Sequence, residues 1–352
     1  MRCVPAPLGL GPPPPDRTAL DAVRHLSRRF PDARVREVPV VRAAELDPRA
    51  DPTGTTRIWL ALEALQVTGS FQVRGALLAV ASASGSNSRS RHVVAPSVGN
   101  HGIGVAYAAC VLGMSATVVV PRTASRTKRE KIERYGAELV VASTDRYDVA
   151  EALAKEIAMT ESAAFVAPAN DVELMLGNGG SLGFEIVRGL GGVPERVLAP
   201  FGGGGLATGL AWALAADAVG PTERRVWGVQ SEVCSRMATS LECGAVVDGP
   251  CTHGPTLAEE LAGVLSADAF ERARGAIAGI AIVTETQIAS AMAHAYEDMG
   301  LVLEGTAAVA LAPALFGLPD RLRGGDVVVL LTGRNIDPDR LDAVLARAER
   351  AV

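Results

Sequence analysis

Short apolar runs alternate along this chain with stretches whose apolar residues recur at helical spacing. Residues 58–65 form an apolar run of strand length, and a turn follows at Gly69. Beyond the turn, the apolar residues have the spacing of a helix face: Val73, Ala76, Leu77 and Val80. Ser70 stands where its hydroxyl can cap that helix. The pattern predicts a strand, a tight turn and a helix, an arrangement that often holds anions and cofactors.

Further strands are predicted along the chain at 93–95, 115–121, 137–143, 165–171 (a strand with its turn), 197–199 and 225–232. The strands at 115–121 and 137–143 begin about twenty residues apart and have a helical stretch between them. That spacing favours a parallel pair joined by a right-handed crossover. The fold class is therefore expected to be α/β with parallel sheets.

Two turns with candidate binding residues each stand between a predicted strand and a predicted helix. The turn at 96–101 precedes a helix at 102–112, and four glycines precede a helix that starts at Leu206. These glycines are Gly202, Gly203, Gly204 and Gly205. Because they lack Cβ atoms, their N–H groups can converge on a phosphate. Neither a Walker loop nor a G-x-G-x-x-G dinucleotide loop matches this spacing, and a flexible linker fits poorly between a strand and a helix.

The N-terminal part of the chain is less regular. Residues 1–20 contain the stretch GLGPPPPD, which predicts a loosely packed, flexible leader. An amphipathic helix is expected at 18–30, and the Ser/Gly-rich residues 82–91 are expected to form a link between two parts of the fold.

Composition narrows the classes of protein that the chain can belong to. The 352 residues are 48% hydrophobic, enough for two lobes with their own cores. The net charge of -5 gives no basis for a nucleic-acid partner, and the apolar runs are too short for a membrane span. No signal peptide is visible, and the five cysteines show no C-x-x-C pair or common zinc spacing. We expect a cytoplasmic protein with reduced thiols and no metal site.

Lysine is scarce in this sequence. Of 34 basic residues only Lys128, Lys131 and Lys155 are lysines. All three lie in stretches of alternating charge, which predict solvated helix faces. None stands near a glycine turn in the sequence.

The segment TGSFQVRGA, residues 68–76, resembles the Schiff-base motif S-F-K-x-R-G-A of fold-type II pyridoxal-phosphate (PLP) enzymes. The resemblance is to the threonine/serine dehydratase and serine racemase branch, whose motif lysine carries PLP as an internal aldimine. Similar segments follow in the family's order over roughly residues 55–340, namely 97–101, 177–186, 202–205, 254–264, the segment from Glu304, and the segment after 331. The resemblance implies a tryptophan synthase β-like fold with two doubly wound domains, a large one (21–84 and 175–352) and a small one (85–174). It also implies a homodimer.

The resemblance assigns roles to individual residues. Gln72 occupies the position of the lysine, and a carboxamide can neither form an imine nor abstract a proton. The residues expected to bind the cofactor are Phe71, Asn100, Gly202, Gly203, Gly204, Gly205, Leu206, Glu304 and Thr332. Those expected to bind substrate are Ser70, Ser97, Gly99 and His101. A hydroxyl at Thr332 would leave the pyridine nitrogen unprotonated, which favours elimination over transamination. Without the resemblance, Asn100 is typical of a turn residue and His101 of a cap.

Other positions also depart from the family pattern. They are Val98 where racemases have a proton-donating serine, Glu259 and Glu260 in place of Asp-Gly, Ala307 in place of a glycine, and Arg334 in place of a glycine. Valine has no exchangeable proton, so racemisation by the serine route is disfavoured. Glu259 and Glu260 either change the charge of the pocket or are plain surface carboxylates of a helix.

Three hypotheses of function remain open from the sequence. The first is a PLP-dependent lyase of the amino-acid dehydratase or ammonia-lyase type, with Gln72 as an engineered substitution that stops turnover. The second takes Gln72 as native, with PLP bound noncovalently or as an external aldimine and with altered chemistry on a small amino acid. The third is a catalytically inactive ligand-binding or regulatory protein on the same fold. A displaced Schiff-base lysine is disfavoured, because no lysine is near a site motif in the sequence.

Overall fold

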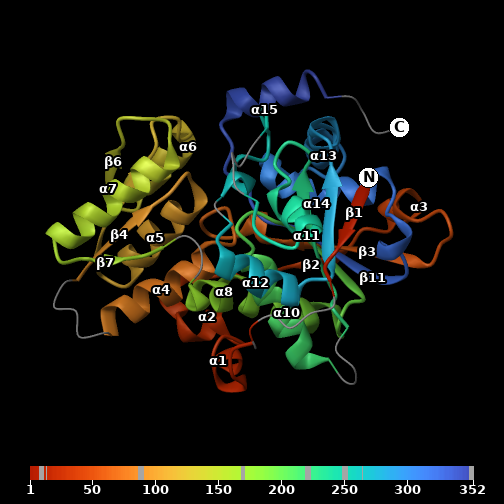
Figure 1. Cartoon of the computed structure of the whole chain (residues 1–352), viewed down its shortest axis with the longest axis horizontal. Helices are drawn as coiled ribbons and strands as arrows, with labels where there is room; N and C mark the ends of the chain where they lie inside the picture. Colours follow the sequence, from red (N-terminus) through yellow and green to blue (C-terminus); the bar gives the residue numbers. More distant parts are fainter. Residues whose placement is uncertain are drawn as a thin grey trace.

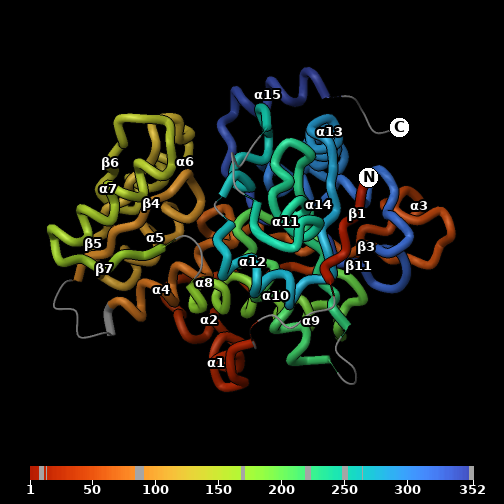
Figure 2. Tube along the Cα trace, viewed as in Figure 1, coloured from red at the N-terminus to blue at the C-terminus, as the bar shows by residue number. Residues whose placement is uncertain are grey.

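The structure, a computed structural model, describes residues 1–7, 12, 14–85, 91–167, 171–218, 223–247, 253–263 and 265–348. Within these residues the strands form two sheets, one of seven strands and one of four. Figure 1 shows the four-stranded sheet with its helices on the left and the seven-stranded sheet on the right. The tube in Figure 2 shows that the chain enters the smaller part after α4 (Val73–Gly85) and leaves it before α9 (Ser181–Leu190).

The larger sheet has the strand order β1-β10-β9-β8-β11-β3-β2. Its strands are β1 (Arg2–Pro5), β2 (Val40–Arg42), β3 (Thr56–Leu62), β8 (Arg196–Pro200), β9 (Val226–Ser231), β10 (Gly279–Val283) and β11 (Gly325–Leu331). The five inner strands run parallel, whereas β1 and β2 pair antiparallel at the two edges. The predicted α/β class with parallel sheets is confirmed.

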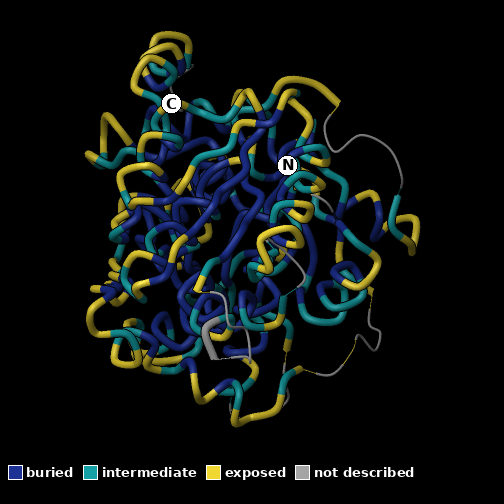
Figure 3. The backbone as a smooth tube through the Cα atoms, turned by 90° about the vertical axis from the view of Figure 1, so that its left-hand side faces the viewer, coloured by how far each residue is buried: buried dark blue, intermediate teal, exposed yellow. Residues whose placement is uncertain are grey.

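Both faces of this sheet are covered by helices, as the alternation along β11 shows. Val327, Val329 and Leu331 pack into one core, and Val328 and Leu330 pack into the core on the opposite face. Side chains that alternate between two apolar layers require the nearly continuous apolar run that the sequence has here. In Figure 3 the strands at the centre are buried and the exposed residues lie on the outer helices and loops.

The helices of the larger part divide between these two layers. One face carries α3 (Asp47–Ala50), α13 (Glu285–Glu297), α14 (Gly305–Phe316) and α15 (Pro338–Leu345), with the short helices η2 (Ala44–Leu46), η5 (Glu259–Ala262) and η6 (Asp320–Leu322). The other face carries α9, α10 (Gly205–Asp217), α11 (Arg236–Cys243) and α12 (Ala267–Ala276). The π-helix η4 (Leu176–Gly180) and α8 (Val172–Met175) precede α9, and η3 (Glu63–Leu65) follows β3.

The smaller sheet is parallel throughout and has the order β6-β5-β4-β7. Its strands are β4 (His92–Pro96), β5 (Ser115–Val120), β6 (Glu138–Val141) and β7 (Ala164–Phe165). Helices α4, α5 (Asn100–Val111) and α6 (Arg126–Arg134) pack on one face, and α7 (Tyr147–Thr160) packs on the other. The predicted parallel pair at 115–121 and 137–143 is confirmed as β5 and β6.

The N-terminal predictions need correction. Residues 2–5, which the sequence assigned to a loose leader, form β1, whose partner is β10. The single helix expected at 18–30 is instead two short helices, α1 (Arg17–Asp21) and α2 (Leu26–Arg29), followed by the 3-10 turn η1 (Pro31–Ala33). Residues 22–25 form a turn between the two helices, and Leu20, Val23 and Leu26 are buried in one cluster.

Some sequence predictions fall outside the described residues. They include residues 8–11 and 13 of the leader, 86–90 of the predicted link, 168–170 and Cys251. The proposed domain boundaries stay a prediction. Among the described residues no helix is long and apolar enough to span a membrane.

Candidate active site

The site lies where loops from both sheets meet, beyond the carboxyl ends of parallel strands. Residues 68–72 follow β3 and η3, the glycines 202–205 follow β8, and residues 332–335 follow β11. From the smaller sheet, residues 97–100 follow β4 and α6 follows β5. Ligands of α/β proteins bind at such strand ends, because loops and helix N-termini converge there.

The loop after β3 is fixed to the loop after β11 by backbone contacts. Phe71 N–H donates to the Thr332 carbonyl at 3.2 Å, and Arg334 N–H donates to the Gly69 carbonyl at 2.9 Å. Gly69 has φ +83, and a Cβ there would lie 2.4 Å from Asn335 Oδ1, so glycine is required on both grounds. These contacts fix the segment of Phe71 and Gln72 beside the segment that begins at Thr332.

Ser70 and Gln72 each present a buried polar atom without a partner among the described residues. Ser70 Oγ makes no hydrogen bond, and neither does Gln72 Oε1. The prediction that Ser70 caps the following helix is therefore wrong, because α4 begins at Val73 and receives no hydrogen bond from that hydroxyl. Buried polar groups are nearly always hydrogen-bonded, so these two atoms mark a place where a ligand can supply the partner.

The predicted loop 97–101 is held in shape by Ser97. Its Oγ accepts hydrogen bonds from Gly99 N–H at 2.9 Å and Gly102 N–H at 2.8 Å. Helix α5 begins at Asn100, two residues earlier than predicted. The alternative interpretation of His101 as a cap finds no support, because α5 has no side-chain cap and the His101 Nε2 lies 3.4 Å from the Val166 carbonyl. Burial lowers the pKa of His101 to about 4, and its role in substrate binding stays a prediction.

Glu260 places its carboxylate at the centre of the site, on the N-terminus of α5. One oxygen, Oε1, accepts from Lys128 Nζ at 2.7 Å and from Asn100 N–H at 3.1 Å. The other oxygen, Oε2, accepts from Asn100 Nδ2 at 3.0 Å and Gln72 Nε2 at 3.2 Å. Burial alone would raise the pKa of Glu260, but Lys128 and these hydrogen bonds outweigh burial and lower it.

Glu304 is a second buried carboxylate beside Glu260. Its Oε1 accepts from Asn100 Nδ2 at 2.6 Å, and its Oε2 lies 3.3 Å from Lys128 Nζ. Burial raises the pKa of Glu304 to about 7, and the charge of Glu260 adds to this effect while Lys128 opposes it. This carboxyl group can therefore gain or lose a proton near neutral pH.

The prediction that Lys128 lies on a solvated helix face is wrong. Its side chain is only 6% exposed and forms ion pairs with Glu260 and Glu304. Burial disfavours the ammonium, but the two carboxylates outweigh burial, so the pKa of Lys128 lies above its ordinary value. The alternating charge of this segment is a sound signal for α6 itself, but it could not show that this helix turns one lysine towards another part of the chain. Lys155, in contrast, is exposed as predicted, and it forms an ion pair with Glu151.

Lys131 and Asn335 complete the polar side of the site. Asn335 Nδ2 donates to Asn100 Oδ1 at 2.6 Å and to the Thr68 carbonyl at 3.1 Å, and Lys131 donates to Asn335 Oδ1. Lys131 was also predicted to be solvated, whereas burial lowers its pKa. Asn335 was missed as a site residue, although it closes the segment TGRN that was recognised by its family likeness.

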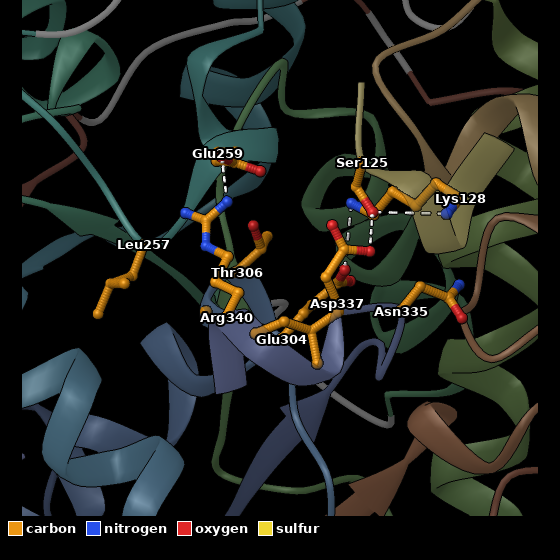
Figure 4. A pocket seen from close by; sticks show the side chains of 11 residues that line it. Ser125, Lys128, Leu257, Glu259, Glu304, Thr306, Asn335, Asp337 and Arg340 are labelled. Atoms are coloured by element: carbon orange, nitrogen blue, oxygen red, sulfur yellow. Dashed lines mark hydrogen bonds and ion pairs between the residues drawn. The ribbon is translucent and has the colours of Figure 1, made fainter. Parts of the chain in front are cut away.

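Glu259 and Glu260, which the sequence could not separate, have different surroundings. Glu259 is 52% exposed and pairs with Arg340 at the edge of the pocket. Figure 4 shows this pair on one side of the pocket and Lys128 and Asn335 on the other. Arg334 does not enter the polar cluster, because its guanidinium donates to the Ala64 carbonyl. This cluster consists of Asn100, Lys128, Glu260, Glu304 and Asn335.

Three of the four glycines, Gly202, Gly203 and Gly204, form the loop that precedes α10. Helix α10 begins at Gly205, and Gly204 has φ +87. Among the described residues, the N–H groups of Gly202, Gly203 and Gly204 donate to no other residue. A Cβ on Gly202 would lie 2.9 Å from the Glu260 carbonyl, so the loop packs directly beside η5. Unpaired N–H groups ahead of a 13-residue helix form a suitable site for an anion.

The structure thus gathers the predicted residues from both sheets around one polar cluster. Thr332 is buried there at the end of β11, and Phe71 and Leu206 pack against the core beneath the glycine loop. The pocket beside the cluster is small, with a cavity volume of only about 20 Å³, roughly enough for one water molecule. No group of three or more side chains suited to a metal ion occurs among the residues that the structure describes.

Comparison with known proteins agrees with this arrangement. A family model described as "Pyridoxal-phosphate dependent enzyme" matches residues 32–333. The L-threonine ammonia-lyase of Thermotoga maritima is 37% identical over 291 residues, covering 82% of this chain and 69% of that protein. The catabolic L-threonine dehydratase of Escherichia coli is 34% identical and covers 82% and 85%.

Solved structures give the same result. Maize serine racemase superimposes with a TM-score of 0.81 at 25% identity, covering 93% of this chain and 97% of the other. The threonine deaminase from Solanum lycopersicum, in the processed form of its isoform 2, superimposes with a TM-score of 0.79 at 26% identity, covering 97% and 92%. With the fold, the ordered loops and the sequence match in agreement, the chain belongs to the family of pyridoxal-phosphate dependent enzymes.

Proposed function

We propose that this protein binds PLP without a covalent bond and acts on a small amino acid in a reaction related to dehydration or ammonia release. The observation that carries the proposal is the position of Gln72 directly before α4, with its Nε2 donating a hydrogen bond to Glu260. We place Gln72 where the family's lysine would stand. Its amide nitrogen has no nucleophilic lone pair, so no imine can form there.

The residues present fit the cofactor apart from that bond. The unpaired N–H groups of the glycine loop suit its phosphate, and helix α10 adds the positive end of a dipole. We assign the orientation of the cofactor ring to Asn100 and Thr332, which are both buried polar residues. Glu260 and Lys128 fill part of the space between, so binding requires these side chains to move.

PLP, when bound, supplies an electron sink that acidifies the α-hydrogen of an amine attached to it. The chain's own residues then position the substrate and handle protons. Glu304 is the group best suited to hold and release a proton, because its pKa is about 7. Since no lysine amine is positioned for this work at residue 72, the rate would fall by about 10²–10⁴ relative to an enzyme with a positioned base.

We also propose that Gln72 is native rather than engineered. Gln72 and Glu260 both depart from the family pattern, and their side chains contact each other at 3.2 Å. A substitution introduced only to stop turnover would not bring a matching hydrogen-bond acceptor on a segment 188 residues away. This pairing supports the hypothesis of altered chemistry on the inherited fold.

The second candidate function is a catalytically inactive ligand-binding or regulatory protein. The observation in its favour is that Glu260 already occupies the donors of the Asn100 loop. The unpaired glycine loop speaks against a complete loss of anion binding, because a purely structural loop has no need of unpaired N–H groups. For either function we propose a cytoplasmic homodimer that binds small molecules.

The test is a PLP titration followed by borohydride reduction and peptide mass analysis. We expect saturable binding by visible absorbance, no pyridoxyl group on any lysine, and an aldimine absorbance only when an amino acid is added. The control Gln72→Lys should acquire a reducible adduct at residue 72. Absence of PLP binding would reject the proposal, and a pyridoxyl group on Lys128 of the unmodified chain would show that cofactor attachment is covalent after all.

A further inference from the structure

The donors at the start of α5 form a binding site for a carboxylate, and in this structure the carboxylate is the protein's own. We propose that Glu260 is an internal occupant of this subsite, that the carboxylate of an amino-acid ligand displaces it, and that Lys128 then becomes the counter-ion of the ligand. The proposal deepens the proposed function, because it defines how a small amino acid enters the site. It does not depend on whether PLP is bound.

The geometry of the subsite is that of a built anion site. Lys128 Nζ, Asn100 N–H, Asn100 Nδ2 and Gln72 Nε2 lie 2.7–3.2 Å from the two oxygens of Glu260. These donors come from α6, α5 and the segment before α4, which are separate elements. A Cβ on Gly99 would lie 2.8 Å from Lys128 Nζ and 3.0 Å from Glu260 Oε1, so glycine is what allows both groups to reach the helix N-terminus.

The balance of charge requires exchange rather than addition. Lys128 already faces two buried carboxylates, Glu260 and Glu304. A third carboxylate would leave at least two buried negative charges against one ammonium, which is strongly unfavourable at low exposure to solvent. If the ligand's carboxylate replaces that of Glu260, the charge of the subsite stays the same and all four donors keep a partner.

The unpaired atoms near the subsite indicate the rest of the ligand. Gln72 Oε1 is a buried acceptor without a partner among the residues that the structure describes, and the carboxamide already touches the subsite through Nε2. Ser70 Oγ is fully buried and likewise has no partner in the described part of the chain. A ligand that carries an ammonium beside its carboxylate can donate to Gln72 Oε1, so the chemistry favours a zwitterionic amino acid over a simple carboxylic acid.

Glu260 is held in a way that permits its release. Its backbone N–H donates to Thr306 Oγ1 at 3.2 Å, so η5 keeps its position when the side chain moves. Glu304 remains within 3.3 Å of Lys128 and partly neutralises the ammonium during the exchange. Glu259, the neighbouring glutamate, pairs with Arg340 at the pocket edge and takes no part in the subsite.

Calorimetric titration of the full chain with L-serine and with ethanolamine, which differ by the carboxylate alone, tests the proposal. The variants are Glu260→Ala, Glu260→Gln and the matched control Glu259→Gln, each checked for folding by circular dichroism and Tm. We expect Glu260→Ala and Glu260→Gln to bind L-serine about tenfold or more tightly than the unmodified chain, with ethanolamine binding unchanged. Glu259→Gln should leave both affinities unchanged. Adding Lys128→Met to Glu260→Ala should abolish the gain for L-serine.

Three results would overturn the proposal. They are unchanged L-serine affinity in both folded Glu260 variants, an equal gain for ethanolamine, which would show only that the cavity is larger, or an equal gain in Glu259→Gln. The titrations are run with and without PLP, while PLP binding itself is followed by absorbance. A serine-specific gain without PLP binding would reject the proposed function but retain this inference, and PLP binding without the gain would do the reverse.

Discussion

At the scale of single residues, the chemistry of this site depends on a few buried groups whose charges are balanced against each other. Lys128, Glu260 and Glu304 share one small volume, and Asn100 donates to both carboxylates. Lys128 and the hydrogen bonds lower the pKa of Glu260, whereas burial raises that of Glu304. One carboxylate is therefore kept ionised and the other is poised near neutrality.

Glu304 should make the stability of the cofactor-free protein depend on pH. Its folded-state pKa of about 7 lies above its ordinary value of 4.5, so the folded state binds this proton more tightly than the unfolded state. The contribution of this proton to the free energy of unfolding is fully present below about pH 4.5 and is lost as the pH rises through about 7. Glu304→Gln should remove this loss, so Tm measured by calorimetry should fall less across that window. Identical pH profiles for Glu304→Gln and the unmodified chain would contradict this prediction.

At the residue scale the sequence predicted candidates but not their partners. The candidates Gln72, Asn100 and Glu304 do come together in the fold. They could be identified in the sequence because each lies in a segment with a recognisable motif. The role of Lys128 could not be predicted, since the charge pattern of α6 is the same whether its lysine faces water or a carboxylate from another part of the fold. Only the folded chain brings Glu260 to Lys128, across 132 positions of sequence.

At the scale of elements, α4 is anchored by a buried cluster of charges beneath the site. Arg74 is fully buried, and its Nη2 lies 2.7 Å from both Glu63 Oε1 on η3 and Glu185 Oε2 on α9. Removal of the guanidinium would leave two buried carboxylates without a cation. This cluster joins the segment after β3 to α9 and so fixes where Gln72 projects.

Arg74→Met should destabilise the protein by about 3–5 kcal/mol, because methionine fills the space but cannot pair with Glu63 or Glu185. Urea unfolding monitored by circular dichroism gives the free energy directly. The control is Arg122→Met, which removes an exposed arginine paired with Asp145 and should cause no measurable change. A loss in Arg74→Met no larger than in the control would show that the cluster does not anchor α4.

The elements themselves were largely predictable, and the exceptions have physical causes. Apolar runs predicted β3, β4, β5, β6, β8, β9 and the parallel pairing, because buried parallel strands need continuous apolar sequence. Strand β1 was missed, because it is only four residues long and its pairing with β10 spans most of the chain. The helix expected at 18–30 is interrupted by a turn at 22–25, which apolar periodicity could not indicate because the buried residues on both sides of the turn keep helical spacing.

At the scale of the whole molecule, the site joins the two sheets. Asn100 and Lys128 belong to helices packed on the smaller sheet, whereas Gln72, Glu260 and Glu304 belong to segments of the larger part. The ion pairs of Lys128 with Glu260 and Glu304 therefore connect α6, which Figure 1 shows beside the smaller sheet, to segments of the larger part. Ligand entry that displaces Glu260 would loosen this connection on one side.

Lys128→Met should weaken this connection more than it disturbs either core. The variant leaves Glu260 and Glu304 buried beside each other without a cation, so like charges repel and at least one carboxyl group takes up a proton. Hydrogen–deuterium exchange should therefore rise in residues 97–101 and 259–262, which face each other across the site. Exchange should stay low in the inner strands β5 and β11 of the two sheets. The rise should be larger at alkaline than at acidic pH, because the two carboxyl groups repel each other only when both are ionised, and loss of Lys128 removes the charge that opposes the raised pKa of Glu304. Lys155→Met removes an exposed lysine from α7 and is the matched control, with no expected change in either loop. An equal rise in all segments would mean that Lys128 stabilises the fold in general, and no rise at the loops would mean that its ion pairs do not hold the two parts together.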